Sequence, residues 1–280
     1  MCLARTVETV RDRAAVEVGP RITRRRLLAG LGAAGAAAAV GLPLPSAAAT
    51  RARGRVRDLT HVFRAGFPVY GFDPPARQTL VTVPEDGFYS QQWTFHEHTA
   101  THMDAPGHFV EGGRLSPEIS PRELVGVPLV VIDISARVAE NPDALVRRKD
   151  LAAFEREHGP IPEGAIVCMY SGWETRAGDP DAYRNVGDDG LFHFPGFGLP
   201  AVEWLLENRA ITGIGVDTLS LDNGPSQTFD VHLALLGADR YGLENLRNLS
   251  RIPPTGATAY VGLIPWEEGS GGPCRVIATW

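Results

Sequence analysis

Four of the eight histidines in this chain lie in one short segment, at positions 96–108. Within it the order is His98-x3-His102-x-Asp104-x3-His108. Neutral imidazoles and a carboxylate are ligands that Zn²⁺ and Mn²⁺ accept in proteins. Imidazoles clustered beside a carboxylate are also typical of sites that transfer protons. The segment therefore predicts a divalent-metal site with a titratable histidine next to it.

The spacing restricts how these side chains can meet. On a straight strand His98 and His102 would lie about 13 Å apart, which is too far for two ligands of one ion. His102 and Asp104 are two residues apart, so a strand points both to the same face within roughly 7 Å. The chain must therefore turn at the three residues that follow His98. A second turn at Pro106, which cannot continue a central strand, places His108 beside the ligands as a candidate general base.

A second group of polar residues follows an apolar run much later in the chain. Asp217–Asp222 comes directly after a run expected to be a buried strand, and His232 and Glu244 follow. Taken alone, His232 is more typical of a packed or capping histidine, and Glu244 of a solvated helix face. These residues by themselves leave their role open.

The N-terminal segment has the features of an export signal. The arginine cluster Arg24–Arg26 precedes an apolar run from Leu27 to Leu42, and small residues follow at 46–49. The paired arginines resemble a twin-arginine signal, and a run of about 16 residues is shorter than the ~20 of a membrane span. We predict that residues 1–49 are cleaved after export to the periplasm or the outside of the cell, and that 50–280 form the mature domain.

The charge balance argues against two classes of partner. The chain carries 27 Lys+Arg and 33 Asp+Glu, and the leader holds seven of the basic and three of the acidic residues. The remaining 231 residues therefore have a net charge of −10. Nucleic acids and anionic membranes favour a basic face, so neither nucleic-acid binding nor stable membrane association after cleavage is expected. A body of this length suits one large domain.

Short β-branched apolar runs alternate with amphipathic segments in the mature chain. Strands are expected at 127–134, 165–170, 211–217, 260–264 and 275–279, and helices at 149–158, 201–209 and 231–236. Because several strands follow one another without a helix between them, we predict a single α/β domain with a mixed β-sheet. The two mature cysteines, Cys168 and Cys274, leave open a disulfide or two buried thiols.

These motifs resemble the metal-dependent cyclase family, which includes bacterial kynurenine formamidases and isatin hydrolases. The family hallmark is H-x-G-T-H-x-D-x-P-x-H, and the resemblance covers nearly all of residues 57–280. The matching segments are Asp58–Thr60, Phe67–Tyr70, His98–His108, Asp217–Ser220, His232 and Glu244.

The resemblance implies a role for each matching residue. By position, the family's metal ligands fall on His98, His102, Asp104, His232 and Glu244. The first three would hold one ion, and Asp104 with the last two would hold a second where the site is binuclear. The proton-transfer residue falls on His108. The implied fold is the family's swivelling β/β/α domain, commonly a dimer.

Two residues depart from the family pattern. Ala100 stands at the usual glycine, so either the backbone there is conventional or the first site is slightly altered, because a positive φ is less favourable for alanine. Tyr70 is the expected substrate contact, and it stands where kynurenine formamidases have a Trp that packs on the substrate ring. This substitution and the predicted export both make N-formylkynurenine a less expected substrate.

Together these features predict an exported, homodimeric, metal-dependent hydrolase. It would cleave a C–N bond other than a peptide bond (amide, formamide or lactam) in a small molecule, using one or two Zn²⁺ or Mn²⁺ ions. The metal would lower the pKa of a bound water that attacks the carbonyl, with His108 as general base and then acid. One alternative is a metal-dependent lyase or cyclase that acts through an enolate with the same base. The other is a non-catalytic exported metal-binding protein, which has no need of His108.

Overall fold

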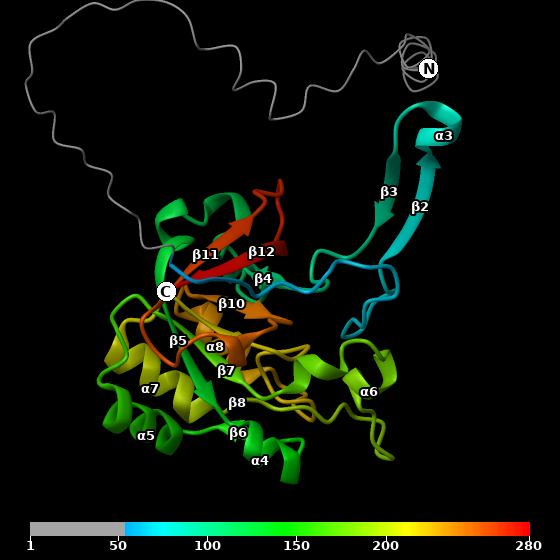
Figure 1. Cartoon of the computed structure of the whole chain (residues 1–280). Coiled ribbons are helices and arrows are strands. Elements are labelled where there is room, and N and C mark those ends of the chain that lie inside the picture. The colour runs from blue at the N-terminus through cyan, green and yellow to red at the C-terminus, as the bar shows by residue number, and fades with distance from the viewer. Residues whose placement is uncertain (1–53) are drawn as a thin grey trace, which may run out of the picture. The chain divides into compact units, whose positions relative to one another are not determined.

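The computed structural model of the chain describes residues 54–280, and the predicted leader, 1–49, lies outside the described residues (Figure 1). The described chain divides into two compact units. One consists of residues 77–92, and the other of residues 54–76 and 93–280. Among the helices of the described part, none is long and apolar enough to cross a membrane.

The larger unit is built on a mixed sheet that closes into a barrel. Its strands are β1 (Val56–Asp58), β4 (His102–Asp104), β5 (Val125–Asp133), β7 (Ile166–Tyr170), β9 (Gly213–Val216), β10 (Tyr241–Glu244), β11 (Ala257–Leu263) and β12 (Gly271–Thr279). Their order is β1-β12-β11-β5-β7-β9-β10-β4, and the pairing of β12 with β4 closes the sheet. Neighbours from β5 to β10 run parallel, and the other pairs are antiparallel. The predicted α/β class and mixed sheet are therefore confirmed.

Helices cover the outer face of the parallel strands. They are α4 (Ser135–Glu140), α5 (Arg148–His158), α6 (Pro180–Arg184), α7 (Leu199–Arg209) and α8 (Asp230–Gly237). Single 3-10 turns occur at Pro106–His108, Ser116–Glu118, Pro121–Glu123, Trp173–Arg176 and Leu249–Arg251. Two short strands, β6 (Leu145–Val146) and β8 (Gly196–Phe197), pair in parallel. Helices α5 and α7 contact each other and lie along the same side of the sheet (Figure 1).

The sheet lies between two apolar cores, and a single strand contributes side chains to both. On β5, Val130 and Ile132 belong to a core that also contains residues of α5, α7 and α8, whereas Leu129 and Val131 belong to the core that fills the barrel. Successive side chains of a strand point to opposite faces, so a continuous Val/Ile run serves both cores. This is why the apolar runs in the sequence predicted β5, β7, β9, β11 and β12, whose observed bounds overlap the expected ones.

The smaller unit is a β-hairpin that the hydrophobic pattern does not predict. It contains most of β2 (Ala76–Val81) and β3 (Ser90–Thr94), with the short helix α3 (Val83–Asp86) between them. Most residues of β2 are exposed, so the segment lacks the buried alternation by which a strand is recognised in a sequence.

The two cysteines in the described part are free and buried. Cys274 lies in the barrel core, as does Cys168. Burial raises the pKa of both thiols far above the ordinary value, because the thiolate is poorly solvated there. Of the two alternatives that the sequence left open, the structure has the buried thiols.

Candidate metal centre

The centre of the site is the short strand β4, which carries two of the predicted ligands. Met103 faces the barrel core, so its neighbours His102 and Asp104 point to the opposite face. Strand β10 pairs with β4 in a register that places Glu244 directly opposite His102. The Nε2 atom of His102 lies 3.3 Å from a carboxylate oxygen of Asp104 and 3.3 Å from one of Glu244.

A turn before β4 brings His98 back to the same point, as its spacing predicts. Ala100 occupies the left-handed region, with φ 56°, so the alternative of a conventional backbone at this position is wrong. This conformation is less favourable for alanine than for glycine. The turn places Nδ1 of His98 2.7 Å from an Asp104 oxygen. The carbonyl oxygen of Ala100 also accepts a hydrogen bond from Nδ1 of His102, at 2.9 Å, which leaves Nε2 of that ring for the centre.

Helix α8 supplies the third imidazole. His232 lies in its first turn, and its Nε2 atom is 3.2 Å from Glu244 and 3.4 Å from Asp104. The other ring nitrogen, Nδ1, donates to Asp222 at 2.6 Å. Taken alone, His232 suggested a packed or capping histidine and Glu244 a solvated helix face, and both interpretations are wrong. His232 faces the cluster, and Glu244 lies on a buried strand. The structure thus brings all five predicted ligands together.

The donor atoms form two overlapping groups. Atoms of His98, Asp104 and His108 lie within 4.8 Å of one another, and so do atoms of His102, Asp104 and Glu244. Asp104 belongs to both groups, so its carboxylate is the donor that the two groups share. His108, predicted as the proton-transfer residue, lies in the first group.

Two buried atoms of the cluster make no hydrogen bond within the protein, although oppositely charged groups lie 3.3–3.4 Å away. Nε2 of His102 and one carboxylate oxygen of Asp104 are buried and have no hydrogen bond, and the two residues are only 2% and 1% exposed. An unpartnered buried carboxylate oxygen is costly unless it is paired or coordinates a metal. The donors present, imidazole nitrogens and carboxylate oxygens, suit a divalent cation.

The electrostatics of the cluster favour a positive charge. Burial opposes protonation of His102, but the Asp104 and Glu244 carboxylates outweigh it and raise the pKa of His102 to about 10. Burial likewise opposes protonation of His232, and Asp104, Asp222 and Glu244 raise its pKa well above the ordinary value. The same carboxylates that hold protons on these rings would hold a divalent cation in their place.

Comparison with known proteins identifies the family. The Cyclase family model matches residues 57–223. The chain is 34% identical over 200 residues to the isatin hydrolase of Roseibium aggregatum, covering 68% of this chain and 75% of the relative. It is 27% identical over 195 residues to the kynurenine formamidase of Bordetella pertussis, covering 69% and 83%. A crystal structure of an isatin hydrolase bound to the product analogue thioisatinate is similar, with a TM-score of 0.77, 28% identity and coverage of 92% of this chain and 99% of that one. The chain belongs to the cyclase family.

In this cyclase-family chain, a hydrogen-bond relay holds the Nε2 atom of the His98 ring. Ser270 donates from Oγ to Glu97 at 2.6 Å, and its oxygen lies 3.0 Å from Nε2 of His98. An ionised carboxylate only accepts, so the Ser270 proton points to Glu97 and the Ser270 oxygen accepts from His98. The other ring nitrogen, Nδ1, donates to Asp104 at 2.7 Å, and loss of that proton would free its lone pair for a cation. The sequence left Glu97 and Ser270 without a role, because they act through another side chain.

Replacing Ser270 by alanine should weaken metal binding about 10–100-fold, because removing the acceptor frees the tautomer and orientation of His98. Metal affinity can be measured by competition with a chromophoric chelator. Ser250→Ala, at an exposed serine outside the relay, is the matched control and should bind metal as the wild type does. Equal affinities in the two variants would show that the relay does not orient His98.

His108 belongs to the first donor group and lies over the ring of His98. It ends the 3-10 turn Pro106–His108, and its ring stacks on that of His98 with centroids 3.7 Å apart and planes at 24°. Burial lowers the pKa of His108 to about 4; the Asp104 charge opposes the effect and His98 adds to it. The imidazole is therefore neutral at pH 7 and able to accept a proton.

Aromatic side chains form an apolar wall next to His232. Tyr70 is half-buried and packs edge-on against Phe192 and Phe229, with centroids 5.0 and 5.7 Å away. Phe229 and Phe109 in turn contact His232, at 5.7 and 4.8 Å. Tyr70, predicted as a substrate contact, thus belongs to a larger wall. Phe109 and Phe229 were missed, although each lies within three residues of a predicted site histidine.

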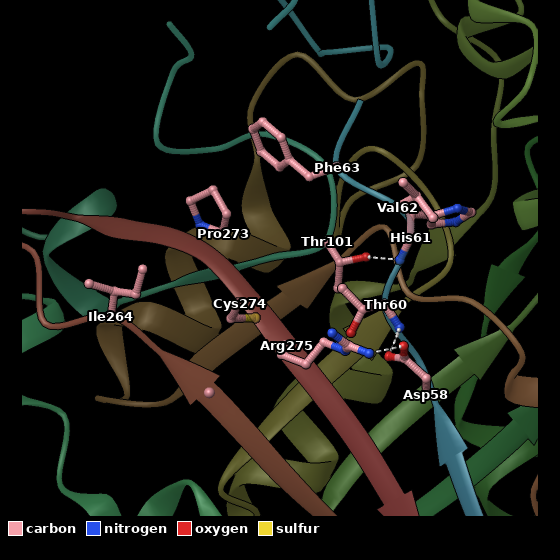
Figure 2. Close-up of a pocket in the computed structure, with 12 residues that line it drawn as sticks. Asp58, Thr60, His61, Val62, Phe63, Thr101, Ile264, Pro273, Cys274 and Arg275 are labelled. Carbon is pink, nitrogen blue, oxygen red and sulfur yellow. Dashed lines mark hydrogen bonds and ion pairs between the residues drawn. The ribbon is translucent and has the colours of Figure 1, made fainter. Parts of the chain in front are cut away.

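A cavity of about 500 Å³ lies beside the site without including any predicted ligand (Figure 2). Figure 2 shows the ion pair between Arg275 and Asp58, 2.7 Å long, at one side of it. It also shows the backbone N–H of His61 donating to Oγ of Thr101, at 2.9 Å. Because Ala100 and Thr101 line it, the cavity borders the segment that leads into β4.

Proposed function

We propose that this protein hydrolyses a non-peptide C–N bond (an amide, formamide or lactam) in a small molecule, with a divalent metal as cofactor. The observation that carries the proposal is the convergence of His98, His102, Asp104, His232 and Glu244 on one point with His108 beside it. The named activities of the isatin hydrolase and kynurenine formamidase relatives support the same class of reaction.

The protein's own residues account for the proton transfers that hydrolysis requires. A divalent cation, when bound, supplies Lewis acidity that polarises a carbonyl and makes water nucleophilic near neutral pH. His108 accepts the proton of the attacking water, because burial keeps its ring neutral. The stacked ring of His98 fixes the orientation of His108, which then delivers the proton to the leaving nitrogen.

The aromatic wall favours a flat substrate. Tyr70 packs on Phe192 and Phe229, and Phe229 lies next to His232; aromatic surfaces of this kind pack well on an aryl ring. An aryl-fused lactam offers both the ring and the scissile C–N bond in one plane. We therefore propose a substrate of the isatin type ahead of N-formylkynurenine.

Three further parts of the proposal concern the cofactor, the assembly and the place of action. Asp104 lies in both donor groups, so one or two ions of Zn²⁺ or Mn²⁺ are proposed. A homodimer is proposed by resemblance to the family. Export by a twin-arginine-type leader at residues 1–49 is proposed from its arginine cluster and apolar run.

The proposed function is tested by activity of the metal-loaded protein on isatin and N-formylkynurenine in ¹⁸O-labelled water. We expect ring opening of isatin with one ¹⁸O in the new carboxylate. Turnover without ¹⁸O incorporation would indicate the lyase or cyclase alternative. A metal-loaded protein that is inert towards both compounds and towards a wider panel of amides, lactams and esters would contradict the hydrolase and favour the metal-binding alternative.

A further inference from the structure

A second cavity, of about 560 Å³, has the character of an anion site. It lies between the loop that contains His61 and Arg64, the segment around Glu174, and the residues from Arg247 to Arg251. Three arginines, Arg64, Arg247 and Arg251, line it. We call this cavity the arginine pocket. Three guanidinium groups at one cavity are notable in a chain whose formal net charge is −6.

The protein offsets the positive charge of the arginine pocket only in part. The single acidic residue in its lining is Glu174, whose carboxylate accepts a hydrogen bond from the backbone N–H of Asn248. Arg64 donates to the carbonyl oxygens of Gly66 and Ala177, which carry no formal charge. Within residues 54–280, no ion pair to a carboxylate is formed by any of the three arginines.

Two buried polar atoms at the arginine pocket have no hydrogen-bond partner in the described part of the chain. They are Nε of Arg247, a donor, and Nε2 of His61. An unsatisfied buried donor is unfavourable, and its presence in a native structure calls for a partner that the protein lacks. Burial lowers the pKa of His61 to about 4, and the charges of Arg247 and Arg64 add to the effect.

The arginine pocket is distinct from the metal centre. None of the five predicted ligands, nor His108, lines it. A buried hydrogen-bonded layer separates the two: the N–H of His61 donates to Oγ of Thr101, which donates to the carbonyl oxygen of Asn245 at 2.6 Å. Thr101 immediately precedes His102, and Asn245 immediately follows Glu244. This hydrogen-bonded layer forms one wall of the arginine pocket. Two of its residues are therefore sequence neighbours of the predicted ligands His102 and Glu244.

We propose that the arginine pocket binds a small oxyanion, a carboxylate or a phosphate, at a site separate from the metal centre. The planar guanidinium presents two parallel N–H groups that match either anion, and three such groups line the arginine pocket. Carboxylate and phosphate share this chemistry. They differ in source, since the first is the product class of amide hydrolysis and the second is a free inorganic anion.

Calorimetric titration of the metal-loaded protein tests the proposal, with inorganic phosphate in one arm and benzoate in the other. We expect at least one of these anions to bind with one site per chain. Arg247→Gln and Arg251→Glu should each weaken that binding at least about tenfold, because each removes a charge-assisted donor or reverses a charge. Arg122→Gln, at an exposed arginine away from the pocket, is the matched control and should leave binding unchanged.

The variants also separate the pocket from the metal. An anion that binds the metal would give heat that persists in both pocket variants, and this result would overturn the proposal, as would the absence of heat with both anions. Binding of phosphate alone or of benzoate alone, lost in the variants, supports the site and identifies its class. The Arg251 side chain is exposed, so Arg251→Glu is expected to fold and decides the question if Arg247→Gln does not fold.

Discussion

Replacing His108 by alanine is expected to lower kcat about 10²–10⁴-fold while the protein keeps its metal. His108 is the buried neutral imidazole beside the cluster, and it stacks on the ring of His98 without sharing a hydrogen bond with it. Removing it deletes the proton acceptor but leaves the five predicted ligands in place. The measurement pairs steady-state kinetics on isatin with metal analysis of the same sample.

The metal content of the variant decides between two roles for His108. His108 lies in one donor group with His98 and Asp104, so loss of metal along with activity would show that it is a ligand. Full activity in the variant would discard the assignment as base. His158→Ala, at an exposed histidine, is the control and should behave as the wild type in both measurements.

Asp104→Asn is expected to abolish metal binding and to lower activity more than 10³-fold. Asp104 is the only residue common to both donor groups among the described residues, and it is 1% exposed. The amide replaces a charged ligand by a neutral one and places an NH2 group against the ring nitrogens of His98, His102 or His232. Metal content, activity and thermal unfolding check this expectation, with Asp188→Asn at an exposed aspartate as the control.

Metal removal from the wild type should reproduce the same loss reversibly. Chelation is expected to abolish turnover, and Zn²⁺ or Mn²⁺ should restore it. A ligand present at 1,000 times its Kd stabilises a protein by about 4 kcal/mol, so the chelated form should unfold at a lower temperature. Metal affinity should rise with pH, because His102 and His232, whose pKa values the carboxylates raise, must lose protons to bind. Undiminished turnover after complete metal removal would refute metal dependence.

The sequence predicted the features of this site that are local to the chain. Two residues at i and i+2 share a strand face whatever surrounds them, so His102 and Asp104 were placed together correctly. The distance limit between His98 and His102 required a turn between them, and the turn is present at Ala100. Its left-handed conformation was not predicted, because alanine does not favour it.

The partners of β4 could not be predicted from the chain alone. Glu244 stands opposite His102 because β10 pairs with β4 in one register, and a slip of one residue would turn its carboxylate to the other face. That register depends on the closure of the barrel, including the pairing of Gly271 and Pro273 with β4. Without the family resemblance, a lone Glu244 in a polar segment suggested a solvated helix.

The residues that hydrogen-bond to the predicted ligands were even harder to predict from the sequence, because their positions depend on the folded state. Asp222 accepts from His232 ten residues away, and Ser270 reaches His98 from 172 residues away. Spacing along a strand follows from bond geometry, which every segment carries with it. Contacts between distant segments form only when both apolar cores are packed, because burial of those cores sets the relative positions of β4, β10 and α8.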